Sequence, residues 1–273
     1  GEVLYRDISY NHGPLAPYCN ALLFTNLGTG VATIAGFNIL LTFIISLAIY
    51  FLFRYLTDPL TAIAAVGVFI TVFAFSQYLE IGNYNFITPY SGNLVYGFVL
   101  ALIAFLGFRR YLISPGPAPA LIIGIAAGGT ILTRFDISVA VILSIAIGLA
   151  FYYRKTRPGR RILPAHPLVI IGAIMVPPIL FALKIGLGDW LTMNFSQFHP
   201  EIIERQSGNR FYLALSGLDE PIVNLGRIVK VGIAYLILTG FEGIVAAGPG
   251  RITDPVRRTV WMSVLAVLLA VLA

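Results

Sequence analysis

Residues 31–53 read VATIAGFNILLTFIISLAIYFLF, a run without a single charged side chain. A helix needs about 20 apolar residues to cross the hydrocarbon core of a bilayer. A backbone inside lipid must satisfy its own hydrogen bonds, so such a run is predicted to be a helix. Seven further ranges have the same apolar character, and they are Pro59–Leu79, Leu94–Phe108, Gly116–Thr133, Ile137–Tyr153, Pro167–Leu183, Val231–Gly248 and Thr259–Ala273. The sequence therefore predicts an all-α polytopic membrane bundle with about eight transmembrane helices.

The composition supports this class of protein. Of the 273 residues, 58% are hydrophobic and 11% are charged. A soluble globular domain has about 25% charged residues, so a soluble fold would have too little polar surface. The net charge of +6 comes from lysines and arginines spread between the apolar runs. That distribution is typical of membrane topology, so we expect the lipid bilayer, and no nucleic acid, as a partner.

The charges also sort by side when eight spans alternate the loops across the membrane. One side carries most of the basic residues, which are Arg54, Arg109, Arg110, Arg154, Lys155, Arg157, Arg160, Arg161, Arg251, Arg257 and Arg258. The other side carries most of the acids, which are Glu2, Asp7, Glu80, Asp136, Asp189, Glu201, Glu204, Asp219 and Glu220. The positive-inside rule makes the first side cytoplasmic. We therefore expect an integral protein of the plasma (inner) membrane with an acidic extracytoplasmic face.

Two segments are predicted to lie on that outer face. Residues 1–28 form the first outer loop, and Leu15–Phe24 is apolar but too short to span, which favours an interfacial helix. Residues 188–225 form a long outer loop with a short helix at 200–208. All of these parts belong to one membrane domain, residues 1–273, which we expect to be truncated at both ends because it starts without Met and stops within an apolar run.

Local sequence patterns also predict where two helices start and where two helices pack closely. Asp58 and Asp254 each precede a proline, which is the pattern of an N-cap residue followed by Pro at the first helical position. Gly124 and Gly128 form a small-xxx-small pair, which predicts close packing against another helix.

Charged and aromatic groups on the outer face suggest a site at the membrane surface. A lipid-linked phosphate presents its charge at this depth, and the planar fork of arginine donates two parallel hydrogen bonds to phosphate. The candidate phosphate ligands on this side include Arg134, Arg205, Arg210, Arg227 and Lys230. No HExxH motif or cysteine-rich spacing is present, so the sequence gives no metal site.

Three stretches resemble a known family. YRDISYNHGPLAPYCNALLF (5–24) is similar to the first outer loop of the GT-C class of polytopic membrane glycosyltransferases. This class includes protein O-mannosyltransferases and the aminoarabinose and galacturonic-acid transferases that modify lipid A, so the chain looks like a family 39-like glycosyltransferase. NYNFITPYSGNLVYGFVLAL (83–102) resembles the second outer loop of the class, and LTRFDISVA (132–140) resembles its turn with an arginine and an acid.

The resemblance implies a GT-C-like fold and an enzyme that uses a polyprenyl-phosphate sugar as donor. The acceptor would be a hydroxyl on a glycan, a lipid or a protein, and transfer would invert the anomeric centre. Asp7 would act as general base, and Glu80 would assist catalysis or bind a divalent metal, although no cofactor is otherwise implied. The substrate-binding candidates are Arg6, Tyr10, His12, Tyr90, Arg134, Asp136, Arg205, Arg210, Arg227 and Lys230.

Each of these residues has a simpler interpretation. Asp7 with Arg6, and Arg134 with Asp136, could be plain ion pairs, and Glu80 could be an interfacial charge. His12 could serve only as a hydrogen-bonding loop residue, and interfacial tyrosines are ordinary in membrane proteins.

Two other function classes also stay open. One is a transporter or flippase for a lipid-linked glycan or small solute, which Glu242 inside an apolar run would suit. The other is a non-catalytic scaffold subunit of a membrane complex.

Overall fold

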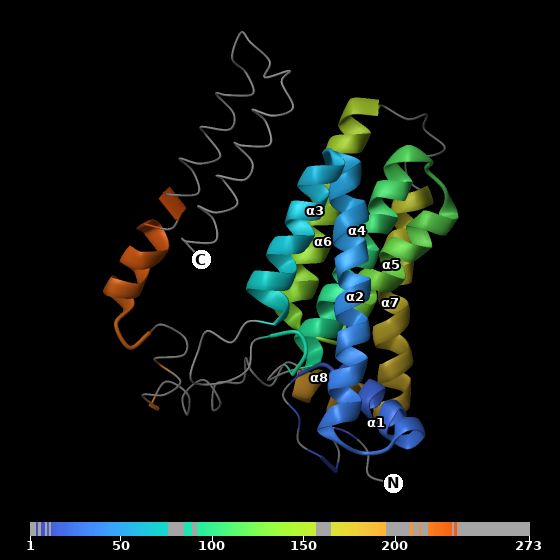
Figure 1. The fold of residues 1–273 in the computed structure, drawn as a ribbon. Helices are drawn as coiled ribbons and strands as arrows, with labels where there is room; N and C mark the ends of the chain where they lie inside the picture. Colours follow the sequence, from blue (N-terminus) through green and yellow to red (C-terminus); the bar gives the residue numbers. More distant parts are fainter. Residues whose placement is uncertain are drawn as a thin grey trace.

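The computed structural model describes residues 4, 7, 8, 10, 12–75, 85–88, 92–156, 165–194, 208–209, 213, 218–230 and 232–233. The described part is helical and contains no strand, apart from an isolated β-bridge between Leu4 and Ile8. The long helices lie side by side as an upright bundle (Figure 1). In chain order the helices are α1 (Leu15–Leu27), α2 (Val31–Leu56), α3 (Pro59–Val68), η1 (Phe69–Ala74), α4 (Gly92–Ile113), α5 (Pro117–Ile131), α6 (Phe135–Thr156), α7 (Ala165–Ile185) and α8 (Leu187–Asn194). The element η1 is a π-helix that directly continues α3.

The predicted spans correspond to these helices in the part of the chain that is described. Helices α2, α4, α6 and α7 are long and apolar enough to cross a membrane, which indicates an integral membrane protein. The apolar helices formed by residues 59–74 and 117–131 are shorter. In the described part of the chain, four helices are thus long enough for a span, and the last two predicted spans and the predicted helix at 200–208 lie outside the described helices. The total of about eight spans stays a prediction.

The outer surface of the bundle is apolar, as a lipid environment requires. In α6 the exposed large side chains Val139, Leu143, Ile147 and Phe151 recur every fourth residue and so form one stripe along the helix. Exposed large apolar side chains also recur along α2 and α7. A soluble protein rarely exposes apolar patches of this extent. These stripes therefore fit contact with lipid tails.

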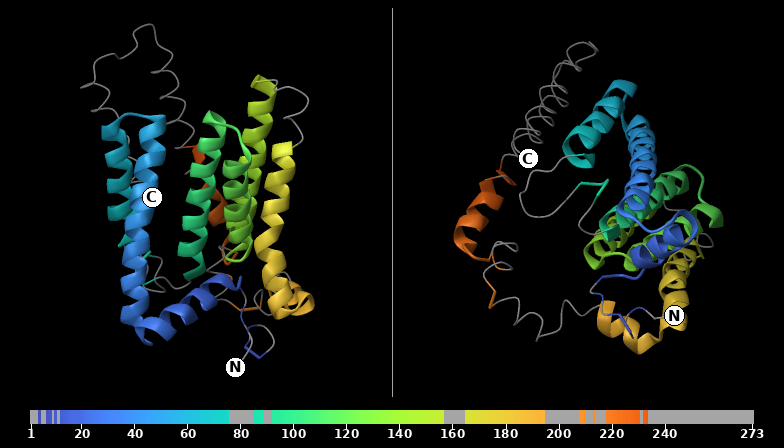
Figure 2. Two further views of the ribbon diagram at one scale, coloured as in Figure 1. Left: turned by 90° about the vertical axis from the view of Figure 1, so that its right-hand side faces the viewer. Right: turned by 60° about the horizontal axis from the view of Figure 1, so that its bottom comes forward.

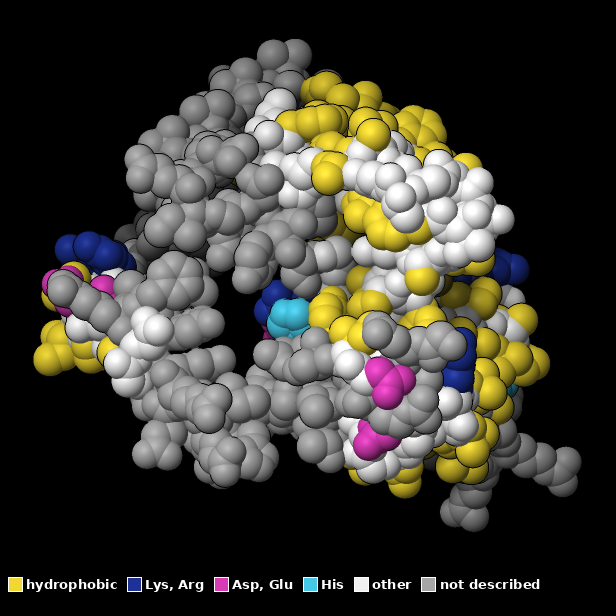
Figure 3. Space-filling view, turned by 90° about the horizontal axis from the view of Figure 1, so that it is seen from below, with side chains coloured by type: hydrophobic (Ala, Val, Ile, Leu, Met, Phe, Trp, Pro, Cys, Tyr) yellow, Lys and Arg dark blue, Asp and Glu magenta, His cyan; other side chains and the backbone are white. Residues whose placement is uncertain are grey.

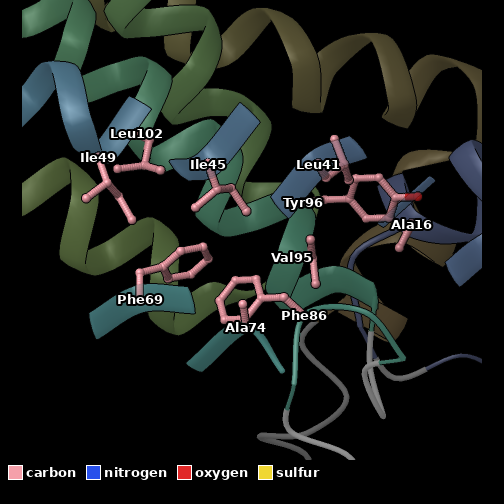
Figure 4. Packing of buried hydrophobic residues seen from close by; sticks show 10 residues of the cluster. All are labelled: Ala16, Leu41, Ile45, Ile49, Phe69, Ala74, Phe86, Val95, Tyr96 and Leu102. Carbon is pink, nitrogen blue, oxygen red and sulfur yellow. The ribbon is translucent and has the colours of Figure 1, made fainter. Parts of the chain in front are cut away.

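The interior combines apolar packing with polar side chains. Figure 4 shows one core cluster, in which Ile45 and Ile49 of α2 pack with Phe69 of η1 and with Val95 and Leu102 of α4. In α2, the buried side chains also include Asn38, whose Nδ2 donates to the carbonyl oxygen of Ile87 at 3.0 Å, and Thr42.

The pairing of α5 with α7 depends on small residues. A Cβ atom added at Gly128 would overlap the carbonyl oxygen of Ile174, and one added at Gly124 would overlap the Cβ of Ala173. Neither position has room for a side chain, because the two backbones approach too closely. The prediction of close helix packing at the small-xxx-small pair is confirmed.

The Asp58 cap is also confirmed. Its Oδ1 accepts hydrogen bonds from the backbone N–H groups of Leu60 and Thr61, both at 3.0 Å, and Pro59 occupies the first position of α3. The bound N–H groups are two of the four that a helix start leaves without a partner inside the helix. Asp254 lies outside the described residues.

The two ends of the bundle differ in charge. Arg54, Arg109, Arg110 and Arg154 lie near the C-terminal ends of α2, α4 and α6, and we call this end the basic end. Contacts join these helix ends, because Arg109 lies over the Tyr55 ring and Tyr111 is hydrogen-bonded to Tyr153. The opposite end carries α1, which lies crosswise below the upright helices (Figure 2), as an interfacial helix would.

The glycine contact gives a direct stability test. Gly128→Ala should lower the stability of the protein because the added methyl group meets the backbone of α7, and overpacking of this kind costs about 1–3 kcal/mol. The measurement is the thermal midpoint of the purified protein in detergent. Gly172→Ala is the matched control, since its Cβ would meet nothing within 4 Å. Equal midpoints for the two variants would contradict the close packing.

Candidate functional site

The N-terminal segment is attached to the turn between α5 and α6. The backbone N–H of Gly13 donates to the carbonyl oxygen of Thr133, and that of Leu15 donates to the oxygen of Leu132, both at 2.9 Å. A Cβ atom at Gly13 would overlap the carbonyl group of Leu132, so only glycine permits this approach. The polar start of the chain is therefore held beside Arg134.

Apolar contacts also hold the same segment in place. Leu4 is buried in a cluster with Leu132, Ile185 and Trp190, which joins the start of the chain to α5, α7 and α8. Asp7 lies between Leu4 and Ile8 in a turn and is exposed. The predicted base is thus at the end of the bundle opposite the basic end.

Tyr10 connects this segment to the first turn of α4. The Nδ2 of Asn93 donates to the hydroxyl oxygen of Tyr10 at 2.6 Å. The Tyr10 ring meets the His12 ring edge to face, with centroids 5.9 Å apart. Burial raises the pKa of Tyr10 above its usual value, while the bond from Asn93 acts in the opposite direction. Tyr10 consequently stays a neutral phenol and serves to hold neighbouring groups in place.

His12 lies in the field of an arginine–aspartate pair. Arg134 binds Asp136 through two parallel bonds, from Nε to Oδ1 at 3.0 Å and from Nη2 to Oδ2 at 2.8 Å. Burial lowers the pKa of His12, the charge of Arg134 lowers it further, and Asp136 partly offsets both. The lowered pKa favours the neutral imidazole, which can accept a proton at one ring nitrogen and donate a hydrogen bond from the other.

The ion pair predicted as the simpler interpretation of Arg134 and Asp136 is thus present. This ion pair uses Nε and Nη2 of Arg134, and no described residue accepts a hydrogen bond from its Nη1. An arginine pre-oriented by one carboxylate can still donate to a phosphate from its remaining edge.

Asn93 is a member of this cluster that the sequence did not indicate. Its side chain is fully buried, and its Oδ1 has no hydrogen-bond partner among the described residues. The sequence pattern that could have indicated it is an asparagine directly before the apolar run Leu94–Phe108, within the stretch 83–102. Its partner Tyr10 is 83 positions away in the sequence, so no local pattern could have linked them.

Not all of the predicted ligands meet here. Arg227 and Lys230 lie in a separate helical stretch, residues 221–230, which stands apart from the α1–α8 bundle in Figure 1. There, Arg227 donates to the side-chain oxygen of Asn224 at 3.0 Å. Five further candidates lie outside the described residues, and they are Arg6, Glu80, Tyr90, Arg205 and Arg210.

Viewed from below, the lower end of the molecule is chemically mixed. Figure 3 shows acidic, basic and histidine side chains on this face, bordered by a large hydrophobic surface. In the described part of the chain, no group of three His, Cys, Asp or Glu side chains could hold a metal ion. The described geometry therefore offers a carboxylate, an imidazole and a guanidinium at one end of the bundle.

Comparisons of this chain with protein-family models, with curated proteins and with solved structures found no match.

The position of His12 predicts a dependence of stability on pH. Its pKa is lower in the folded protein than in the unfolded chain, where it is about 6.5. The unfolded chain then binds the proton more readily, so His12 favours the folded state above that pH and this contribution is lost as the pH falls toward the folded pKa.

The test compares the thermal midpoints of the wild type and His12→Gln at about pH 8 and about pH 5.5, on either side of the ordinary histidine pKa. The wild type should lose more stability on acidification than the variant. Equal losses in both proteins would show that His12 is not the group responsible.

Proposed function

We propose that this protein is a membrane glycosyltransferase that moves a sugar from a polyprenyl-phosphate donor to an acceptor hydroxyl on the extracytoplasmic face. The observation that supports the proposal is the attachment of the N-terminal segment to the α5–α6 turn. It sets Asp7, His12 and Arg134 at the same end of an apolar bundle. A GT-C-like arrangement of about eight spans belongs to the same proposal.

The proposed reaction needs one base and one cation. The carboxylate of Asp7 removes the proton of the acceptor hydroxyl, and the acceptor oxygen forms a bond to the anomeric carbon of the sugar. The bond between that carbon and the phosphate oxygen breaks, and the prenyl phosphate leaves with the electron pair. A positioned base contributes about 10²–10⁴-fold to such a step.

The leaving phosphate already carries negative charge, so it needs cationic stabilisation and no general acid. Arg134 is a described cation next to the segment that carries the base, because Thr133 accepts a hydrogen bond from Gly13. Attack from the side opposite the phosphate inverts the anomeric centre, and a second carboxylate as nucleophile is not required. Asp136 orients Arg134, and Tyr10 with Asn93 holds the segment.

The alternative of a transporter makes different demands on the fold. Transporters place polar groups near the bilayer midplane, on interrupted helices. Here four of the buried polar residues, Asn93, Thr130, Thr133 and Ser138, lie at helix ends next to the N-terminal segment, whereas Asn38 and Thr42 lie inside α2. In addition, α7 continues as one helix through Pro177 and Pro178. These features favour chemistry at the membrane surface over transport through it.

Replacement of the proposed base tests this function. Asp7→Asn should reduce sugar transfer by about 10²–10⁴-fold, because the amide cannot accept the proton. The measurement uses the purified full chain with a panel of polyprenyl-phosphate sugars and follows release of the polyprenyl phosphate.

Asp189→Asn is the matched control, since Asp189 is another acid at the same end of the bundle, in the first turn of α8. It should retain activity. Full activity of Asp7→Asn would remove Asp7 from the mechanism, and a failure of the wild type to consume any donor in the panel would overturn the proposed function.

A further inference from the structure

An arginine at the basic end is held in an unusual environment. The guanidinium carbon of Arg109 lies 4.0 Å from the centroid of the Tyr55 ring, so α4 and α2 meet there through a cation–π contact. The Nε of Arg109 is buried and has no hydrogen-bond partner among the described residues. A buried N–H donor without an acceptor costs about 1–3 kcal/mol, so the described contacts of Arg109 do not satisfy its hydrogen-bonding capacity.

The acid closest in sequence to Tyr55 does not supply that acceptor. Oδ1 of Asp58 accepts from two backbone N–H groups of α3, and its Oδ2 accepts from the hydroxyl of Thr61 at 2.8 Å. The bonds from Thr61 and Leu60 lower the pKa of Asp58, and no arginine contributes to this change. Asp58 therefore serves as the N-cap of α3 and does not form an ion pair with Arg109.

Two more arginines flank the contact, and neither has a carboxylate partner among the described residues. Arg54 precedes Tyr55 in α2 and Arg110 follows Arg109 in α4, and both are exposed. Across the described residues, the ion pair that the structure contains is Arg134 with Asp136, at the other end of the bundle. Arg54, Tyr55, Arg109 and Arg110 together form what we call the arginine–tyrosine cluster, which carries three positive charges.

The surroundings of this cluster indicate what kind of anion fits. Phosphate accepts parallel hydrogen bonds from the fork of arginine, and a guanidinium stacked on an aromatic ring keeps its N–H edge available. Next to the cluster, α2 exposes Phe51, Phe53 and Leu56. A ligand with a phosphate and attached hydrocarbon chains would satisfy both surfaces, whereas free phosphate would leave the apolar one uncovered.

We propose that the arginine–tyrosine cluster binds the headgroup phosphate of an anionic phospholipid in the leaflet at the basic end. Arg109 donates to the phosphate from its place on Tyr55, Arg54 and Arg110 add charge, and the acyl chains lie along the exposed apolar side chains of α2. The lipid fixes the ends of α2 and α4 together. This site is separate from the proposed transferase site and does not depend on it.

Native mass spectrometry of the purified full chain tests the proposal. The detergent-solubilised protein is titrated with phosphatidylglycerol, with zwitterionic phosphatidylcholine and with inorganic phosphate, and bound molecules are counted at each concentration. The wild type should bind phosphatidylglycerol at least about tenfold more tightly than phosphatidylcholine, a difference of about 1.4 kcal/mol. Inorganic phosphate should not displace the lipid at equal concentration.

Variants locate the binding at the cluster. Arg109→Gln should lose about tenfold in affinity for phosphatidylglycerol, which is a typical loss for one charge-assisted hydrogen bond. Arg109→Lys keeps the charge without the planar fork, and its affinity should fall between the other two. Arg227→Gln changes the net charge equally in a separate exposed helix, and its affinity should equal that of the wild type.

Three outcomes would overturn the proposal. One is equal affinity of the wild type, Arg109→Gln and Arg109→Lys for phosphatidylglycerol. Another is an equal loss in Arg109→Gln and Arg227→Gln, which would indicate a general effect of net charge. The third is displacement of the lipid by inorganic phosphate, which would identify a free-anion site. If Arg109→Gln does not fold, the comparison of Arg109→Lys with the wild type decides the question.

Discussion

Two backbone hydrogen bonds, from Gly13 to Thr133 and from Leu15 to Leu132, fix the N-terminal segment at the end of the bundle opposite the basic end, and the proposed transferase site depends on them. They join the polar start of the chain to the turn between two apolar helices more than 100 residues later. The absence of a Cβ at Gly13 makes this approach possible. From that point, Tyr10 reaches α4, His12 lies in the field of Arg134, and α1 turns across the ends of the upright helices.

The two ends of the bundle differ in how their arginines are paired. The described arginines near the C-terminal ends of α2, α4 and α6 have no carboxylate partner within the described residues, whereas Arg134 at the opposite end is held by Asp136. Unneutralised arginines suit an anionic lipid surface. An arginine oriented by a carboxylate suits a defined ligand geometry. The same residue type would therefore have different roles at the two ends.

The sequence predicts local features of this fold well. Residues 31–53 and the following apolar runs predict helices because lipid leaves no other way to satisfy the backbone. Asp58 with Pro59 predicts a cap, and Gly124 with Gly128 predicts a tight helix contact, because each signal lies within a few residues. Tyr10 with Asn93 and Arg109 with Tyr55 were not predictable, since these contacts depend on how distant helices pair.

The position of the N-terminal segment is tested most directly by an engineered disulfide between α1 and α4. The Cβ of Ala16 lies 3.7 Å from the place that a Cβ at Gly92 would occupy, and disulfides need a Cβ–Cβ separation of about 3.5–4.5 Å. In a Cys19→Ser background, Ala16→Cys with Gly92→Cys should oxidise to an intramolecular disulfide, read by intact mass and by loss of maleimide labelling. Ala16→Cys with Gly116→Cys at the basic end should stay reduced. Two free thiols in the first pair under oxidising conditions would contradict the docking of this segment on the bundle.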